Sequence, residues 1–331
     1  MKFNVKNIAL FAALAATCAI TSCKKIKTNE SLPSLDGFLH YSSPVFVLPG
    51  DVLTFIPEGA SHPEDGEYGI YWQASPKGLL TKADTTKRFT DKPSDKDGRV
   101  TLTIPDTLCT FKLTCVMFAT GYSNMYAQNE ICVVKDGSVT NVPHPTGETS
   151  YKDARDERSY TYVTRGGLDW MSTNLSYAET GKPYEGCAPM TGLFGNLYTY
   201  EQAESSCPEG WRLPTIDEWK SVCGGKFAGA AGSLMVDAYF NGAKMWEYWP
   251  AVKVTNSTGM NVIPAGYALP GGGSWQYEGA YRYASFWTSS DYDDEQKYYI
   301  SLYVDQPDVF FGNAHKDNLA ASVRCVRAAT E

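Results

Sequence analysis

The sequence predicts an exported chain with two folded domains, an all-β sandwich followed by an α+β domain. The prediction depends on three observations: an apolar run near the N-terminus, a segment of short β-rich runs separated by turns, and a C-terminal half that combines short helices with strands. The length of 331 residues also exceeds one ordinary compact domain and is sufficient for two.

Composition excludes several classes of protein. Apolar residues make up 43% and charged residues 20% of the chain, which is typical of a globular protein. The net charge is −8 and no basic stripe is present, so the sequence argues against binding of nucleic acid. Only four histidines occur, far apart in the sequence, which argues against a histidine-rich metal site and leaves few partners for a serine or cysteine nucleophile.

The N-terminus carries the signature of export. An apolar run at residues 8–20 follows Lys2 and Lys6. The run is shorter than the ~20 apolar residues that a membrane-spanning helix needs. A basic start followed by a short apolar run is typical of a signal peptide, which we expect at residues 1–22.

The end of this run points to a lipid anchor. Ile20, Thr21, Ser22 and Cys23 follow the order aliphatic, small, small, cysteine. This order resembles a bacterial lipobox, and the resemblance implies that Cys23 becomes the first mature residue and carries lipid, each buried CH₂ of which contributes ~0.8 kcal/mol. We therefore expect an outer-membrane, lipid-anchored protein at the cell surface, with the membrane as one partner. An ordinary secretory signal with an incidental cysteine is the alternative.

Two polar segments are expected to separate the folded parts. Residues 23–36 contain a proline and lack apolar periodicity, which predicts a tether. Residues 137–158 contain two prolines and two glycines and end in a cluster of mixed charge, which predicts a linker between domains.

Residues 37–136 alternate short β-rich runs with turn residues and show no long helical period. Residues 111–119 and 126–134 flank a polar turn at 120–124, as in a β-hairpin. About seven strands in this length predict an immunoglobulin-like sandwich. Trp72 is expected in its core, with a ligand platform as the alternative.

Three cysteines fall in the sandwich, namely Cys109, Cys115 and Cys132. Cys115 and Cys132 straddle the hairpin, at a separation compatible with a bridge. An odd number leaves at least one thiol unpaired unless it pairs across domains, so the pairing stays open.

Two Asp-Thr dipeptides in the sandwich, at Thr85 and Thr107, are followed by threonine and leucine. They resemble the short acceptor pattern of Bacteroidetes O-glycosylation. The resemblance makes both threonines glycosylation candidates.

From residue 159 to residue 328 several short motifs follow one another in order. They are Gly-Asn-Leu-Tyr at 195–198, Cys-Pro-Glu-Gly-Trp-Arg-Leu-Pro-Thr at 207–215, Phe-Trp-Thr-Ser-Ser at 286–290 and Ser-Val-Arg-Cys-Val at 322–326. This ordered set closely resembles the Fibrobacter succinogenes major paralogous domain, a family typically found on secreted or lipid-anchored bacterial proteins.

The element Arg-Leu-Pro-Thr-x-x-Glu-Trp also resembles the C-type-lectin-like fold shared with sulfatase-modifying factors. There the element opens a helix, with Thr215 as N-cap and Glu218 completing a capping box. Trp219 then points into the core. The resemblance therefore implies a C-type-lectin-like α+β domain at residues 159–328.

The same resemblance places Cys207 and Cys325 where this fold joins a helix to its last strand, and implies a disulfide between them. Such a bridge is consistent with an oxidising, exported compartment. Cys187 and Cys223 remain, and a second bridge is expected between them, with unpaired thiols as the alternative.

Catalysis is not expected. Sulfatase-modifying enzymes use a reactive cysteine pair near the C-terminus, whereas this sequence has only Cys325 in that region. Asp291, Asp293 and Asp294 form an acidic cluster whose oxygens are suited to Ca²⁺. We favour a solvated acidic loop over a Ca²⁺ site and expect no cofactor.

Aromatic residues in the C-terminal half are the best binding candidates. Exposed Trp and Tyr rings offer flat faces with a hydrogen-bonding edge, which suit sugar rings or a protein partner. The alternative is that these rings pack the large loops of the fold. The candidates are Trp246, Tyr248, Trp249, Trp275, Tyr277 and Tyr281.

The sequence therefore predicts a non-catalytic surface lipoprotein with a head that binds a glycan or a protein. A fimbria-associated or adhesin subunit that assembles by strand addition through the sandwich is the second hypothesis. A glycan-active hydrolase is the third, and it needs a pair of acids that sequence alone cannot bring together.

Overall fold

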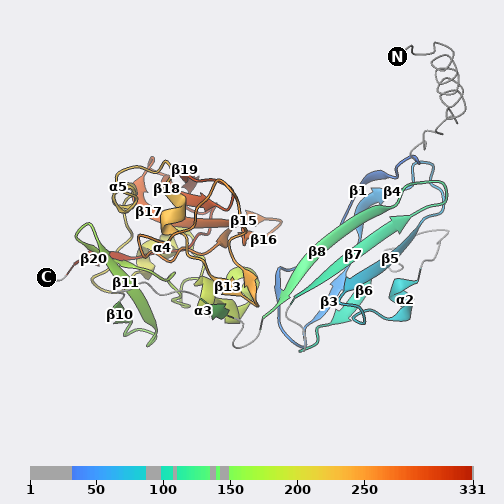
Figure 1. Cartoon of the computed structure of the whole chain (residues 1–331), viewed down its shortest axis with the longest axis horizontal. Helices are drawn as coiled ribbons and strands as arrows, with labels where there is room; N and C mark the ends of the chain where they lie inside the picture. Colours follow the sequence, from blue (N-terminus) through green and yellow to red (C-terminus); the bar gives the residue numbers. More distant parts are fainter. Residues whose placement is uncertain (1–31, 87–97, 107–109, 135–138, 142–148, 330–331) are drawn as a thin grey trace, which may run out of the picture.

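The computed structural model describes residues 32–86, 98–106, 110–134, 139–141 and 149–329. The chain forms an elongated N-terminal β domain and a C-terminal domain that mixes short helices with sheets (Figure 1). Cys23 and the expected signal peptide lie outside the described residues, as do Thr107 and Cys109. None of the helices in the described part has the length and apolar content needed to cross a membrane.

The N-terminal domain is built from three antiparallel or mixed sheets. Their orders are β2-β8-β7-β5, β3-β6 and β1-β4. The expected hairpin is confirmed as β7 and β8, paired from Thr110↔Cys132 to Met117↔Met125. The elements are β1 (Asp36–His40), β2 (Phe46–Val47), β3 (Val52–Phe55), β4 (Glu58–Ser61), β5 (Gly69–Ser75), α2 (Lys82–Thr85), β6 (Val100–Thr103), β7 (Thr110–Phe118) and β8 (Met125–Val133).

The two small sheets cover one face of the four-stranded sheet. Alternate residues of β7 point into the core between them, because successive strand residues face opposite sides. Phe55 of β3 and Leu102 of β6 meet this core from the other layer. Trp72 is confirmed as a core residue, 2% exposed, with its indole N–H donating to the Gly98 carbonyl at 2.7 Å.

The C-terminal domain contains two larger sheets, β10-β11-β12-β20 and β16-β15-β17-β18-β19, and a small one, β14-β13-β9. The strands are β9 (Val139–Asn141), β10 (Thr149–Lys152), β11 (Ser159–Arg165), β12 (Leu168–Met171), β13 (Tyr239–Phe240), β14 (Ala243–Lys244), β15 (Ala265–Gly271), β16 (Ser274–Ala280), β17 (Tyr283–Asp291), β18 (Gln296–Tyr303), β19 (Val309–His315) and β20 (Val326–Ala328). The helices are η1 (Tyr184–Gly186), η2 (Ala188–Met190), α3 (Thr191–Phe194), α4 (Tyr200–Ser206), α5 (Ile216–Val222) and α6 (Ala231–Leu234).

Part of the expected linker belongs to this fold. Residues 139–141 form β9, which pairs with β13, and residues 149–152 form β10 at the edge of a sheet. Polar composition alone predicts a solvated segment here, but backbone pairing does not require apolar side chains. The C-terminal domain therefore begins with strands that the composition does not reveal.

The predicted helix after Arg-Leu-Pro-Thr is confirmed as α5. Thr215 caps it, and the Thr215 hydroxyl and the Glu218 carboxylate each accept a backbone N–H of the other residue. Such reciprocal bonds satisfy two N–H groups that the first turn otherwise leaves unbonded. Trp219 is fully buried and contacts Trp170 and Phe286, with ring centroids 5.0 and 5.3 Å away.

The two faces of the five-stranded sheet are covered differently. Phe286 and Trp287 are neighbours on β17 and therefore point to opposite faces. Phe286 packs under α5, whereas Trp287 packs under Tyr200 of α4, 5.5 Å between ring centroids. Helix α4 covers only one end of its face, so the rest of that face carries side chains towards solvent.

The two domains share one apolar cluster. Phe46, on the short strand β2, inserts between four rings of the C-terminal domain. Its ring centroid lies 5.4 Å from that of Phe194, and the three other centroids are at most 6.2 Å away. The four rings belong to Tyr184, Phe194, Phe240 and Tyr281.

A carboxylate fixes the same junction. The two oxygens of Glu185 accept the backbone N–H groups of Val45 and Phe46 at 2.8 to 3.0 Å. Nearby, the Asn241 amide donates to the Val133 carbonyl at 3.3 Å. Burial raises the pKa of Glu185, and the two backbone donors oppose that rise. Ring packing and hydrogen bonds together dock the sandwich on the C-terminal domain.

Replacing the carboxylate should weaken this junction. In Glu185→Ala, two N–H groups at the domain boundary lose their acceptor, and we expect a loss of about 2 kcal/mol in the free energy of unfolding. Because folding raises the pKa of Glu185, the protonation of this group increases the free energy of unfolding of the wild type as pH falls. Glu185→Ala lacks the group, so the difference in free energy of unfolding between wild type and variant should be larger at acidic pH. Denaturant unfolding between pH 4 and 8 measures both effects.

Glu179→Ala, at an exposed position of the same domain, is the matched control and should leave stability nearly unchanged. Equal stabilities for wild type and Glu185→Ala would show that the carboxylate does not hold the domains together.

Candidate functional site

The structure contains one of the two expected disulfides. Cys207, after α4, is bonded to Cys325, immediately before β20, across 118 residues of sequence. The expected Cys187–Cys223 bridge is wrong, because both residues are thiols. Cys187 lies in the interdomain cluster, whereas Cys223 packs beside α5 against a different core. Their separate positions explain why no bridge forms.

The sandwich cysteines do not form a bridge across their hairpin. Cys115 faces Ala127 and Cys132 faces Thr110 in the register of β7 and β8. The Cys132 sulfur accepts a hydrogen bond from the Asn241 amide at 3.0 Å. Cys115 is fully buried, and burial raises the pKa of its thiol to about 12, so the reactive thiolate is disfavoured.

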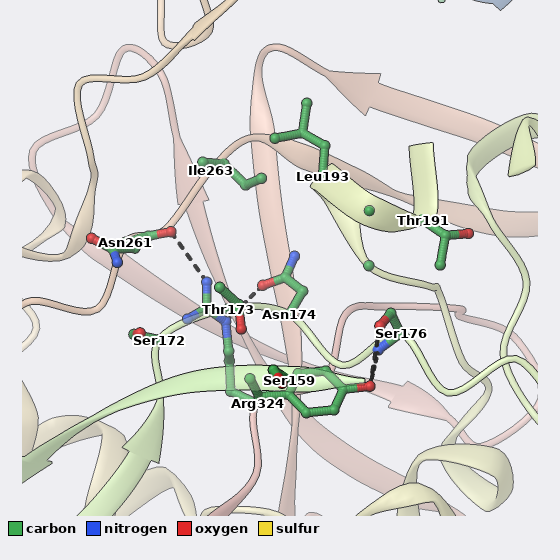
Figure 2. Close-up of a pocket in the computed structure, with 13 residues that line it drawn as sticks. Ser159, Ser172, Thr173, Asn174, Ser176, Thr191, Leu193, Asn261, Ile263 and Arg324 are labelled. Carbon is green, nitrogen blue, oxygen red and sulfur yellow. Dashed lines mark hydrogen bonds between the residues drawn. The ribbon is translucent and has the colours of Figure 1, made fainter. Parts of the chain in front are cut away.

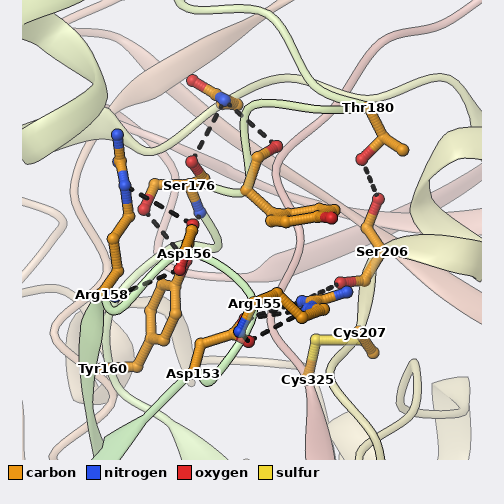
Figure 3. Close-up of polar contacts among 12 residues, drawn as sticks. Asp153, Arg155, Asp156, Arg158, Tyr160, Ser176, Thr180, Ser206, Cys207 and Cys325 are labelled. Carbon is orange, nitrogen blue, oxygen red and sulfur yellow. Dashed lines mark hydrogen bonds and ion pairs between the residues drawn. A yellow bond between two sulfur atoms is a disulfide. The ribbon is translucent and has the colours of Figure 1, made fainter.

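A polar cluster lies next to the disulfide (Figure 3). Arg155 forms a bidentate pair with the buried carboxylate of Asp153, at 2.7 Å for the shortest contact, and also donates to the Ser206 carbonyl. Burial alone would raise the pKa of Asp153, but the bonds from Arg155 hold it below its usual value. The cluster ties the loop before β11 to the end of α4, which indicates a structural role.

The expected aromatic binding residues are dispersed. The predicted exposure of Trp246 is wrong: it is 2% exposed, and its indole N–H donates to the Val262 carbonyl at 2.9 Å. Trp275, Tyr277 and Tyr281 are half-buried against the interdomain cluster. Tyr248 and Trp249 are exposed, at 75% and 42%. Of these six residues, only Tyr248 and Tyr281 line a common cleft, at the domain boundary.

The acidic loop is organised by its own backbone. One oxygen of Asp293 accepts the N–H groups of Glu295 and Gln296, at 2.9 and 2.8 Å, and closes the turn between β17 and β18. Asp291 pairs with Lys297. Within the described residues, no three acidic, histidine or cysteine side chains cluster as a metal site would require.

Thr85, the described glycosylation candidate, is exposed on α2.

A shallow hollow of about 250 Å³ opens on the uncovered face of the five-stranded sheet. Four half-buried tyrosines from three strands surround it, and the hydroxyls of Ser285 and Ser301 form its floor, 2.9 Å apart. We name it the tyrosine hollow. Its lining residues are Tyr267, Leu269, Tyr283, Ser285, Tyr299, Ser301, Tyr303 and Leu319.

Ring contacts hold the tyrosines in place. Tyr267 stacks on Tyr283 at 6.0 Å between centroids, and Tyr283 meets Tyr303 edge-on at 5.0 Å. Phe310, 39% exposed, continues the row beside Tyr303. Burial and then the nearby Glu278 carboxylate raise the pKa of Tyr267 to about 12. The Tyr267 phenol therefore stays protonated at neutral pH and acts as a neutral hydrogen-bonding group.

A second, more polar cavity of about 320 Å³ lies between the start of β11, the loop after β12 and helix α3 (Figure 2). We name it the polar cavity. The Arg324 side chain reaches into it, 1% exposed and held by the Asn174 side-chain oxygen at 2.6 Å and by backbone carbonyls. The Tyr160 hydroxyl meets Ser176 at 3.1 Å on the opposite side.

The sequence offered a partial signal for these sites. Tyr299, Ser301 and Tyr303 alternate along β18, so they share one face of the strand. The same pattern does not tell which face remains uncovered. Arg324 belongs to the Ser-Val-Arg-Cys-Val motif, but the motif does not reveal its contact with Asn174, which lies 150 residues away in the sequence.

Comparison with known proteins supports the C-terminal assignment. A family model described as the Fibrobacter succinogenes major domain matches residues 163–327. No curated protein matches the chain. Among solved structures, the extracellular domains 3-5 of Drosophila OTK match at 9% identity and a TM-score of 0.23, over 43% of this chain and 46% of that one. The chain thus spans less than half of that structure, and at this TM-score the likeness carries no argument about the fold.

The disulfide pattern can be checked directly. Peptide mapping of the unreduced protein should recover one linked fragment that contains Cys207 and Cys325, with Cys187 and Cys223 alkylated after unfolding. Because the bridge closes a loop of 118 residues, its removal in Cys207→Ala should cost about 4 kcal/mol.

Cys223→Ala is the control for this variant and should lower stability less, since it removes no bridge. A linked Cys187–Cys223 fragment would contradict the assignment.

Proposed function

We propose that this chain, whose residues 163–327 belong to the Fibrobacter succinogenes major domain family, is a lipid-anchored surface protein with a non-catalytic carbohydrate-binding head. In this proposal Cys23 carries the lipid and residues 23–36 act as the tether to the outer membrane. The N-terminal sandwich, of the immunoglobulin-like class, holds the C-terminal domain, of the C-type-lectin-like class, away from the membrane.

The tyrosine hollow is the observation that carries the proposal. Sugar rings present apolar C–H faces and hydroxyl edges, and tyrosine offers a ring for the first and a phenol for the second. Here four phenols and two serine hydroxyls converge on one hollow. The strands beneath it are joined by regular pairing, from Tyr283↔Tyr303 to Trp287↔Tyr299, so the rings are positioned before a ligand arrives.

The chemistry of the hollow favours binding over catalysis. Glycoside hydrolysis needs two carboxyl groups on either side of the scissile bond. The described residues that line the hollow are tyrosines, serines and leucines, without a carboxylate, an imidazole or a thiol. One carboxylate, Glu278, lies beside the hollow and accepts the Tyr267 hydroxyl at 3.3 Å, but the lining itself supplies no second carboxyl group to stand opposite it.

Assembly by strand addition has less support as a function. At one edge of the four-stranded sheet, formed by β2, the N–H groups of Val45 and Phe46 are bonded to Glu185. At the other edge, formed by β5, helix α2 lies beside the strand. Both features occupy parts of the sandwich that a donated strand would use.

Substitutions in the hollow should abolish sugar binding without unfolding the domain. A glycan array probed with the purified protein identifies the best-bound glycan. For that glycan, Tyr303→Phe should weaken binding by a few-fold and Tyr303→Ala by at least about tenfold, because the second also removes the stacking ring. Titration calorimetry measures the affinities, and thermal unfolding shows whether each variant is folded.

Tyr292→Ala is the matched control, since Tyr292 is 52% exposed on the same domain but does not line the hollow. Unchanged affinity in both Tyr303 variants would rule out the hollow as the sugar site.

A further inference from the structure

We propose that the tyrosine hollow selects a sugar residue that carries a free ammonium group, such as a hexosamine without an acetyl group. This selectivity rests on the proposed carbohydrate-binding function and names the class of sugar that the same site takes. Three observations support it: a carboxylate at the rim, the rings of the hollow, and the charges on the surrounding face of the sheet.

The carboxylate belongs to Glu278. This residue of β16 is the direct partner of Tyr267 on β15, so the two side chains lie on one face of the sheet. The Tyr267 hydroxyl donates to Glu278 Oε2 at 3.3 Å. That bond uses one of the two carboxylate oxygens, and the side chain is exposed, so Oε1 can accept a donor from a ligand. An ammonium forms a stronger bond to a carboxylate than a neutral hydroxyl does.

The rings of the hollow add to the attraction for a cation. The face of a tyrosine ring carries negative potential and attracts a cation within ~6 Å of its centroid. The Tyr283 centroid lies 6.0 Å from that of Tyr267 and 5.0 Å from that of Tyr303, with interplanar angles of 24° and 73°. Because the rings are this close, a cation placed against one of them also lies near the next.

The same face of the sheet already holds an ammonium in such surroundings. Lys297 lies two residues before Tyr299 on β18, so both side chains point to one side of the strand. Its Nζ pairs with Asp291 and lies 4.6 Å from the centroid of the Tyr200 ring. A carboxylate and a tyrosine ring thus hold this ammonium together, and the rim of the hollow offers the same two groups to a ligand.

The other charges near the hollow do not compete with a cation. Among the eight described residues that line it, none is a lysine, an arginine or a histidine. Lys297, on the same face, is already paired with Asp291. Arg282, next to Tyr283 in the sequence, lines the cleft at the domain boundary instead. An ammonium that enters would therefore meet Glu278 as an opposite charge, whereas an anion would meet it as a like charge.

The floor and the size of the hollow suit one sugar ring. The Ser285 and Ser301 hydroxyls can each donate to or accept from the hydroxyls of a sugar. The volume of about 250 Å³ lies below the ~300–1,000 Å³ of pockets for drug-sized ligands, so a single sugar residue matches it. A small ammonium without hydroxyl groups would use the rings and leave the floor unused.

NMR titration of the whole ¹⁵N-labelled protein tests the proposal with D-glucosamine and D-glucose, which differ only in the ammonium or hydroxyl group at C2. At about pH 6, where the amine is protonated, and at low salt, D-glucosamine should bind at least about tenfold more tightly. The shifts should include the backbone amides of Ser285 and Ser301, which places the sugar in the hollow.

Glu278→Gln keeps the shape of the side chain and an acceptor for Tyr267 but removes the charge. It should abolish most of the preference for D-glucosamine and leave the affinity for D-glucose nearly unchanged. Glu247→Gln is the matched control, since Glu247 is an exposed acid of the same domain that does not line the hollow. This variant should keep the preference of the wild type.

The outcomes separate this selectivity from the proposed function. Equal affinities for the two sugars, both lost in Tyr303→Ala, would overturn the selectivity and leave the sugar site standing. A preference that persists in Glu278→Gln would also overturn it. Binding of D-glucosamine that is unchanged in folded Tyr303→Ala would contradict both proposals. Absence of D-glucosamine binding would overturn the selectivity alone, because the glycan array tests the proposed function independently.

Discussion

The insertion of Phe46 among four aromatic rings of the neighbouring domain is the contact on which the arrangement of this molecule depends. A single strand of two residues carries the ring, and Glu185 holds the backbone of that strand from the other side. Edge-on ring contacts add to ordinary apolar burial, so the junction resembles a domain core more than a flexible linker. The sandwich and the C-terminal domain are thereby docked on each other.

Docking gives the tyrosine hollow and the polar cavity a defined direction relative to the sandwich. Tyr184, Phe194 and Tyr281 of the junction belong to segments that lead to the polar cavity and to the five-stranded sheet. Helix α3, which begins with Thr191 at the cavity, ends with Phe194 at the junction. If the tether starts at a lipid on Cys23, the sandwich determines how both sites face the surroundings of the membrane. In the proposed function, the sandwich therefore orients the C-terminal domain as well as holding it away from the membrane.

Local patterns predicted much of this fold. The capping box at Thr215 follows from its residue types, and the family resemblance correctly implies the buried ring of Trp219 and the bridge between Cys207 and Cys325. Contacts between distant segments could not be predicted in the same way. Trp246 lies in a segment whose residues are typical of an exposed loop, but its indole N–H bonds to the carbonyl of Val262, 16 residues away. The polar composition of residues 149–152 predicts a linker, yet their backbone forms β10, which pairs with β11 at the edge of a sheet.

The claim that the two domains form one rigid body can be tested most directly in solution by residual dipolar couplings of backbone amides. Couplings from the sandwich and from the C-terminal domain, fitted separately, should give the same alignment tensor within error. Two tensors of different size or direction would mean that the domains reorient independently, and would contradict the docking role of Phe46.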